Sequence, residues 1–175
     1  MACAAAAALA SVMVACGDEP GVDEPAREGL AIDIDGINYN VFITRQLNLG
    51  IPPDKAYYEG PPAKPGNTLY GVFLQACNIS EDEDRTTIAV EDFVVEDNQG
   101  NEFEPIELPE DNAFAYHSTK LQGEECVPEE GSVAQLGPTA GSMLLYDLPL
   151  ENTENRPLEL VVEGPTETKR FELDL

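Results

Sequence analysis

The residue types that most often carry out catalysis are scarce in this chain. His117 is the only histidine, so a histidine-dependent nucleophile or a metal site built on paired histidines would depend on that single side chain. Ser118 follows it directly, which is not how a nucleophile and its base usually meet, and no Gly-x-Ser-x-Gly segment is present. The sequence therefore predicts neither an enzyme nor a bound cofactor, and places His117 in a loop near one end of the domain.

Carboxylates are the other groups capable of chemistry, and they dominate the composition. The chain has 34 acidic and 9 basic residues and a net charge of -25. The acidic run Glu81, Asp82, Glu83 and Asp84 could gather oxygen ligands around calcium. Runs of like charge are more often solvated loops, however. Solubility and self-repulsion explain the overall acidity, and a cationic partner is the alternative.

The same charge balance excludes one class of partner. Nucleic acid binding requires clustered Lys and Arg that replace the counterions of the phosphates. Direct electrostatic adhesion to anionic lipid is disfavoured for the same reason. Any membrane contact is therefore expected from apolar residues or a lipid, and not from surface charge.

The first residues predict an export signal. Residues 2–15 carry no charge, yet they are shorter than the ~20 apolar residues that span a bilayer. Val14 and Ala15 precede Cys16, and the segment resembles the lipobox of bacterial lipoprotein signal peptides, although Met13 stands where leucine is usual. The resemblance implies a signal peptide over residues 1–15 and a diacylated Cys16 at the extracytoplasmic face of the cell membrane. Simple secretion and an unprocessed anchor are the alternatives.

Two cysteines remain once the leader and the lipidation site are set aside. Cys77 and Cys126 would then lie in an oxidising compartment, where two leftover cysteines usually pair. Closing a loop of about 50 residues is worth roughly 4 kcal/mol in the chain-entropy description. A zinc site is the competing interpretation, but no Cys-x-x-Cys spacing supports it. We expect a disulfide.

Residues 16–28 and 29–175 differ in composition. The first segment consists mostly of Gly, Pro, Asp and Glu, which predicts a disordered acidic tether. The second segment is long enough for one β-sandwich core, and no repeat or second domain is visible in it.

The longer segment consists of alternating apolar and polar residues, as expected of strands. The opening hairpin turns at Asp35 and Gly36. Residues 69–79 form an apolar run without alternation, as expected of a central strand covered on both faces, and residues 97–100 predict a second hairpin turn. Together these signals predict an all-β fold, an antiparallel two-sheet sandwich of the immunoglobulin-like kind. In the opening strand the expected inward residues are Ile37, Tyr39, Val41 and Ile43.

Three of these segments also carry a resemblance. Residues 68–78, 93–103 and 143–149 are similar to the telokin-like, immunoglobulin-like sandwiches of actinobacterial lipoproteins, a domain of unknown function. The similarity covers about residues 30–175 and consists of packing and turn motifs. It implies a fold and an extracytoplasmic setting, and it supplies no catalytic residues.

The expected function follows from the predicted export signal and the predicted fold. We expect a lipid-anchored structural or protein-interaction module at the cell envelope, with sheet edges and end loops as contact surfaces. The alternative is a binding module for calcium or a small cationic ligand. Residues 48–68, with the pair Tyr57 and Tyr58, form either a contact loop or a plain crossover. We favour a crossover in which the tyrosines cap one end of the core.

Overall fold

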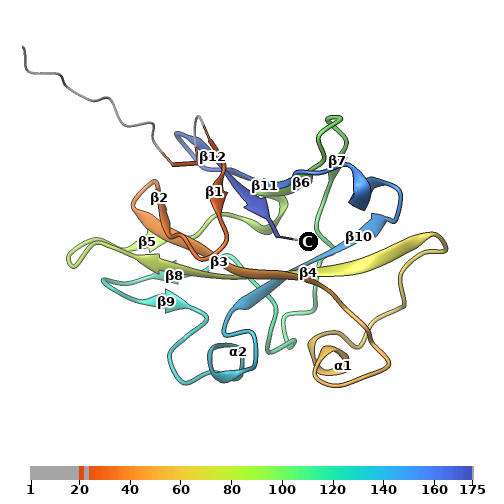
Figure 1. Cartoon of the computed structure of the whole chain (residues 1–175). Coiled ribbons are helices and arrows are strands. Elements are labelled where there is room, and N and C mark those ends of the chain that lie inside the picture. The colour runs from red at the N-terminus through yellow and green to blue at the C-terminus, as the bar shows by residue number, and fades with distance from the viewer. Residues whose placement is uncertain (1–19, 22–23, 175) are drawn as a thin grey trace, which may run out of the picture.

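Alternating apolar side chains pack two β-sheets against each other in this computed structural model, which describes residues 20–21 and 24–174 (Figure 1). The first sheet has the strand order β1, β12, β11, β6 and β7. These strands are Ala26–Arg27, Thr168–Leu173, Leu158–Glu163, Phe93–Glu96 and Glu102–Phe103, respectively. Its pairs are antiparallel except for β1, which runs parallel to β12.

The second sheet is antiparallel and has the strand order β10, β4, β3 and β2, with β9 also paired to β4. These strands are Ser142–Pro149, Asn67–Asn78, Ile37–Gln46, Ile32–Ile34 and Cys126–Val127. The short strands β5 (Arg85–Thr86) and β8 (Lys120–Leu121) pair separately. The chain therefore has the predicted all-β sandwich fold.

Within the described residues, four single-turn helices interrupt the strands. They are α1 (Asp54–Tyr57), α2 (Val133–Leu136) and the 3-10 helices η1 (Val90–Asp92) and η2 (Asn152–Glu154). A helix of this length shows no periodicity in the sequence, which is why none was expected. Over residues 20–21 and 24–174, the structure shows no helix long and apolar enough to cross a membrane.

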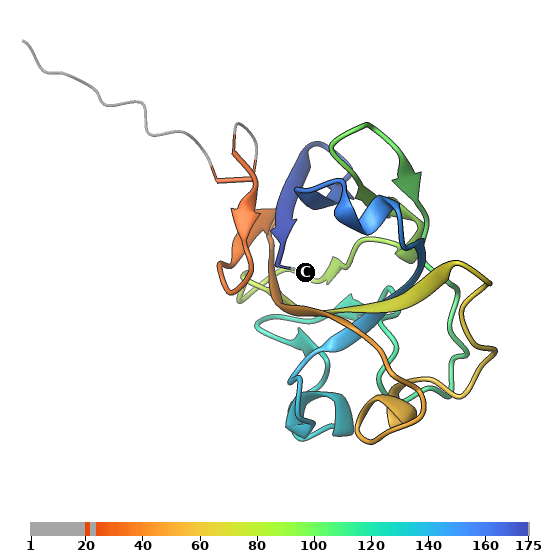
Figure 2. The ribbon, with the colours of Figure 1, turned by 45° about the vertical axis from the view of Figure 1, so that its right-hand side comes forward.

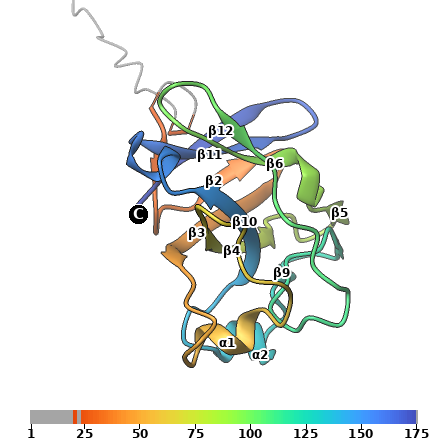
Figure 3. The same ribbon diagram turned by 90° about the vertical axis from the view of Figure 1, so that its right-hand side faces the viewer.

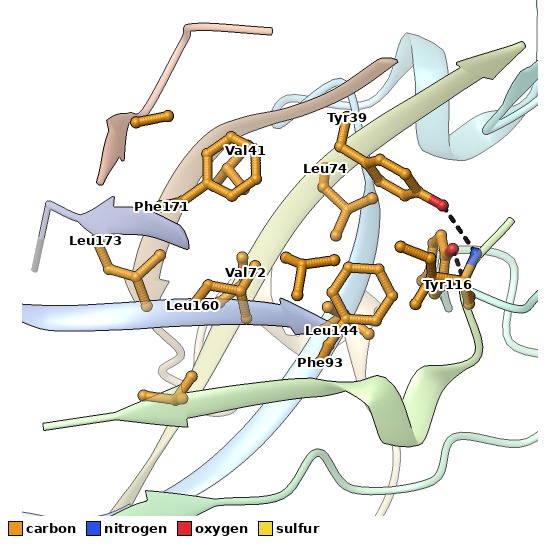
Figure 4. Packing of buried hydrophobic residues seen from close by; sticks show 14 of the residues in the cluster. Tyr39, Val41, Val72, Leu74, Phe93, Tyr116, Leu144, Leu160, Phe171 and Leu173 are labelled. Carbon is orange, nitrogen blue, oxygen red and sulfur yellow. Dashed lines mark hydrogen bonds between the residues drawn. The ribbon is translucent and has the colours of Figure 1, made fainter. Parts of the chain in front are cut away.

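The first hydrophobic core fills the space between the two sheets, and we call it the sandwich core (Figure 4). Side chains from β3, β4 and β10 meet side chains from β6, β11 and β12 there. Tyr39 accepts a hydrogen bond from the Ile88 backbone N–H at 2.8 Å, and the Tyr116 hydroxyl donates one to the Ile88 carbonyl at 2.8 Å. Burial raises the pKa of Tyr39 to about 12. Other members include Val41, Val72, Leu74, Phe93, Leu144, Tyr146, Leu160, Phe171 and Leu173.

The second core covers the opposite face of the β10, β4 and β3 sheet, and we call it the loop-covered core. Leu69 and Phe73 of β4 point to this side, whereas Val72 and Leu74 point into the sandwich core. Residues 69–79 lack alternation because β4 is buried on both faces, as predicted. Two long loops supply the cover, and the remaining members are Leu47, Tyr57, Tyr58, Leu108, Ala115, Met143 and Leu145.

The opening hairpin is confirmed, but its second strand departs from the expected alternation. Asp35 and Gly36 both have positive φ, 52° and 83°, as a two-residue hairpin turn requires. A register shift then occurs in β3 between Val41 and Ile43. The bulge exchanges the two faces of the strand, so that Ile43 is exposed and Thr44 is buried. The prediction that Ile43 points inward is wrong for this reason.

The hairpin of β6 and β7 turns where predicted, and its turn is held by one buried carboxylate. Asp97 accepts hydrogen bonds from the backbone N–H groups of Gln99 and Asn101 and from three side-chain amides. The amides belong to Asn101, Asn152 and Asn155, at 2.8–3.0 Å. Burial opposes ionisation, but these donors outweigh it and hold the pKa of Asp97 well below its usual range. The turn is thereby fastened to the η2 loop.

The sandwich begins earlier than the predicted boundary at residue 29. Ala26 is buried, and β1 pairs with β12. The Gly21 carbonyl accepts a hydrogen bond from the Arg170 backbone N–H at 2.9 Å, and the Glu28 carboxylate accepts one from that of Asp174. Low apolar content predicts disorder, but the free edge of β12 supplies backbone partners that composition does not reveal. The rest of the predicted tether, and the signal peptide at 1–15, lie outside the described residues or at their edge.

Candidate functional site

The end of the sandwich that carries α1 and α2 differs from the rest of the surface, and we call it the helical end. Both helices lie at the same end of the molecule in all three views (Figures 1, 2 and 3). The first described strand, β1, lies at the opposite end. The Thr139 hydroxyl, in the loop after α2, lies 3.3 Å from the Tyr57 hydroxyl and donates a hydrogen bond to it. The loop after α2 therefore contacts α1 in the interior of this end.

The loop that carries α1 joins β3 to β4. These two strands are antiparallel neighbours, so residues 47–66 form a long hairpin loop, and the crossover expected over residues 48–68 is wrong. Asp54 fixes this loop, because its buried carboxylate pairs with Arg45 at 2.6 Å and accepts the Asn48 backbone N–H at 2.8 Å. The loop folds back over the sheet and covers Phe73.

The two tyrosines of this loop point into the molecule. Tyr57 is fully buried, and its ring meets those of Phe73 and Phe114 edge-on with centroids 5.0 and 4.9 Å away. Tyr58 is 9% exposed, and burial together with the charge of Asp147 raises its pKa. They cap the loop-covered core, as expected in the crossover interpretation. They therefore cannot themselves form the alternative contact surface.

Apolar side chains reach solvent beside these tyrosines. In α2, Ser132 caps the first turn by accepting the Gln135 backbone N–H at 3.2 Å, and Ala134 is buried. Val133 and Leu136 of the same turn are 60% and 74% exposed. Ile51, three residues before α1, is 54% exposed. The sequence analysis missed α2, although a serine three residues before Gln135 is a weak capping signal.

The acidic run does not gather into a metal site. Glu83 pairs with Arg85 at 2.7 Å, and Asp84 pairs with Lys120 at 2.7 Å. Glu81 and Asp82 are exposed. In the part of the chain that the structure describes, no group of three or more His, Cys, Asp or Glu side chains could hold a metal ion. The weak calcium candidates Glu81, Asp82, Glu83 and Asp84 therefore lie in a solvated, ion-paired loop.

The predicted pair Cys77 and Cys126 forms a disulfide. The two residues are direct partners across β4 and β9, with Cα atoms 4.1 Å apart. The bond fastens the start of the segment that contains α2 to the central strand of the second sheet. The lipidation candidate Cys16 lies outside the described residues.

A cavity of about 510 Å³ lies beside the edge strand β10, and we call it the acidic cavity. The outer edge of β10 is bridged by Ile106 and Ala115, so the segment between them arches over the strand. Sequence reasoning missed this site, because its residues come from four separate segments. Its lining consists of Val90, Glu91, Glu104, Pro105, Ile106, Glu107, Leu108, Glu110, Tyr116, His117, Met143 and Leu144.

His117 is the lining residue that sequence analysis singled out. Its imidazole Nε2 is buried and has no hydrogen-bond partner among residues 20–21 and 24–174. The neighbouring Ser118 donates its hydroxyl to the Thr87 carbonyl at 2.7 Å. His117 lies in a loop, as predicted, and it lines the cavity.

Comparisons with known proteins support the fold alone. No protein-family model matches the chain, and no curated protein matches it. The yjhA protein from Bacillus subtilis is 13% identical with a TM-score of 0.52, and the alignment covers 85% of this chain and 99% of that one. An uncharacterized β-sandwich protein from Clostridium difficile 630 is 13% identical with a TM-score of 0.50, covering 90% and 100%.

These structural neighbours are consistent with an immunoglobulin-like domain of unknown function. At 13% identity they carry no functional residue over to this chain. Neither is described as an actinobacterial lipoprotein or as telokin-like, so that finer resemblance stays a prediction.

Proposed function

We propose that this chain is an exported β-sandwich, anchored through lipid on Cys16, that acts as a protein-interaction module at the cell envelope. The apolar, uncharged residues 2–15 and the cysteine that follows them support the address. The disulfide between Cys77 and Cys126 supports it independently, because such bonds persist mainly in oxidising compartments.

The exposure of Val133, Leu136 and Ile51 at the helical end carries the proposal. Single exposed apolar residues are common, but Val133 and Leu136 share the one turn of α2, and Ile51 lies three residues before α1 at the same end of the molecule. Water solvates such apolar side chains poorly. Ala134 and Tyr57 anchor these turns in the protein interior, so the exposed side chains stand on fixed backbone. A partner that covered them would remove apolar area from water without having to order the loops first.

The position of this surface fits an anchored module. The chain enters the sandwich at β1, which lies at the opposite end from α1 and α2 (Figure 1). A lipid attached upstream of β1 would hold that end toward the membrane and turn the helical end away from it. The net charge of -25 favours a partner whose rim is basic around an apolar centre.

Export and lipid anchoring are tested on the chain produced in its native host. Mass spectrometry of the mature N-terminus should find a diacylated Cys16, and Cys16→Ser should release the protein from the membrane fraction. A mature chain that retains residues 1–15 and reduced thiols at Cys77 and Cys126 would contradict the proposal.

The contact surface is tested by site-specific photo-crosslinking in the same cells. A photoreactive residue in place of Leu136 should yield one discrete adduct with an envelope protein. The matched control replaces Leu150, which is 52% exposed and follows β10 at its other end. Adducts of equal yield from both positions, or none from position 136, would refute the helical end as the contact surface.

A further inference from the structure

The acidic cavity beside β10 combines one sign of charge with an apolar floor. We propose that it binds an organic cation, an ammonium or guanidinium group attached to an apolar body. This proposal is independent of the lipid anchor and of the contact surface at the helical end. The volume of the acidic cavity, about 510 Å³, lies within the range typical of small-molecule sites.

The rim supplies the charge. Glu91, Glu104, Glu107 and Glu110 are exposed at the cavity, and its lining contains neither Lys nor Arg. Within the described part of the chain, none of these four carboxylates takes part in an ion pair. Charges of one sign around a low-dielectric wall raise the local concentration of the opposite ion. The rim therefore attracts a cation.

The spacing of the rim carboxylates selects the kind of cation. A calcium ion needs several oxygen ligands converging at about 2.3–2.6 Å. Over residues 20–21 and 24–174, no three carboxylates approach closely enough to hold a metal ion. The charge is instead spread around the opening, which suits an organic cation that stays partly hydrated. The spacing therefore favours a small organic cation over calcium, the two cationic ligands that the composition left open.

The floor supplies the apolar contact. Val90, Pro105 and Ile106 are the partly exposed apolar residues of the lining. Met143 and Leu144 of β10 are at most 1% exposed, and Leu108 and Tyr116 are buried too. Leu144 and Tyr116 belong to the sandwich core (Figure 4), whereas Met143 and Leu108 belong to the loop-covered core. The cavity thus lies where the two cores meet, and an apolar group that enters it packs against the partly exposed side chains of Val90, Pro105 and Ile106.

His117 supplies a specific polar contact. His117 lines the cavity, and its Nε2 is buried without a hydrogen-bond partner among the described residues. Buried polar atoms are nearly always hydrogen-bonded, so an unpartnered one at a cavity wall is suited to a ligand. An imidazole nitrogen that carries no proton accepts a hydrogen bond from an ammonium or guanidinium N–H. The cavity therefore combines a negatively charged rim, an apolar wall and one hydrogen-bond acceptor.

The test uses 4-phenylbutylamine as the probe and two-dimensional NMR of the full-length chain as the readout. Titration should produce saturable shifts of the backbone amides of Ile106, Tyr116 and His117. The uncharged analogue 4-phenylbutanol should bind about tenfold more weakly, because it lacks the attraction of the rim. Calcium chloride alone should produce no saturable shift of these amides.

Variants separate the site from a general effect of charge. Glu104→Gln, Glu107→Gln and Glu110→Gln together should weaken amine binding about tenfold. The matched control combines Glu151→Gln, Glu154→Gln and Glu163→Gln, three exposed positions outside the cavity lining, and should change the affinity less than about twofold. His117→Phe keeps a ring of similar size and should weaken binding about threefold.

Four results would overturn the assignment. They are equal affinity for the amine and the alcohol, equal weakening by the two triple variants, saturable shifts confined to other regions, and the same shifts with calcium alone. Each variant is checked by its unliganded spectrum, so a folding defect is recognised before binding is measured.

Discussion

The two faces of the sheet formed by β10, β4 and β3 are buried by different means. On one face, strands of the first sheet pack across it and form the sandwich core. On the other face, two long loops cover Phe73 and Met143 and form the loop-covered core. The first face is covered by a sheet whose strands are joined by repeated backbone hydrogen bonds, and the second is covered by loops held by individual contacts such as the pair of Arg45 and Asp54.

Because of this difference, we expect the sandwich core to supply most of the stability, whereas the candidate binding surfaces lie beside the loop-covered core. The helical end and the acidic cavity both adjoin the loop-covered core, where side chains are not constrained by a strand period. Segments held by few backbone hydrogen bonds open locally at lower free energy than core strands. We infer that the loop layer can open locally while the sandwich stays folded.

Replacing an aromatic residue of the sandwich core should lower the free energy of unfolding more than any other variant, and more than replacing one of the loop-covered core. Phe171→Ala should lower the free energy of unfolding by about 3–5 kcal/mol, because strands on both sides cannot close the space that it leaves. Tyr57→Ala should lower it by about 2 kcal/mol, since its loops can collapse partly onto the site. Both residues are fully buried, so area alone predicts no difference. Urea denaturation measures both values, and equal losses would show that the loops close over a lost ring no better than the strands do.

Removal of the disulfide should have the next largest effect. Cys77→Ala with Cys126→Ala should lower the free energy of unfolding by about 2–4 kcal/mol, because the unfolded chain regains the freedom of a long loop. Hydrogen exchange should accelerate mostly over residues 120–141, which the bond fastens to β4. Acceleration that is equally strong in β11 and β12 would show that the bond supports the whole sandwich instead.

Asp97 is a buried carboxylate that holds the β6–β7 turn of the first sheet to the η2 loop through hydrogen bonds. Asp97→Asn places an amide among donors from Asn101, Asn152 and Asn155 and should cost about 1–3 kcal/mol at neutral pH. The folded pKa of Asp97 is depressed, so its contribution is present above the unfolded value of about 4 and is lost as the pH falls further. Denaturation of both proteins across this range should show their difference shrinking below about pH 4.

The smallest effect concerns the tyrosines at high pH. Burial raises the pKa of Tyr39 to about 12, whereas an unfolded tyrosine ionises near about 10. The contribution of Tyr39 is therefore complete below about pH 10 and is lost as the pH rises toward 12. Ultraviolet titration should show ionisation of Tyr39 delayed until the sandwich unfolds. Its ionisation near pH 10 in the folded protein would contradict the burial of this ring.

The sequence predicted the regular part of the molecule well, because alternation and turn residues report directly on strands. It placed the hairpin at Asp35, the doubly covered strand β4 and the disulfide of Cys77 and Cys126 correctly. It failed at Ile43, where a bulge reverses the faces, and at Ala26, where an edge strand supplies partners. Both failures come from backbone pairing that no local pattern encodes.

The candidate sites were harder to predict for a related reason. The lining of the acidic cavity comes from residues 90–91, 104–110, 116–117 and 143–144, which meet only in the folded chain. The exposure of Leu136 depends on a single helical turn, too short to show a period. Sequence reasoning recognised His117 as unusual but had no means of placing a cavity beside it.

Amide hydrogen exchange of the full-length chain tests the separation of the two cores most directly. The N–H groups of Ile106 and Tyr116, which bridge the loop layer to β10, should exchange through local opening, faster than those of Val72 and Leu160 in the sandwich. Their exchange should also depend less on added urea than that of the sandwich amides. Exchange of all four amides at one rate, with one dependence on urea, would show that the two cores open only together and would contradict the account.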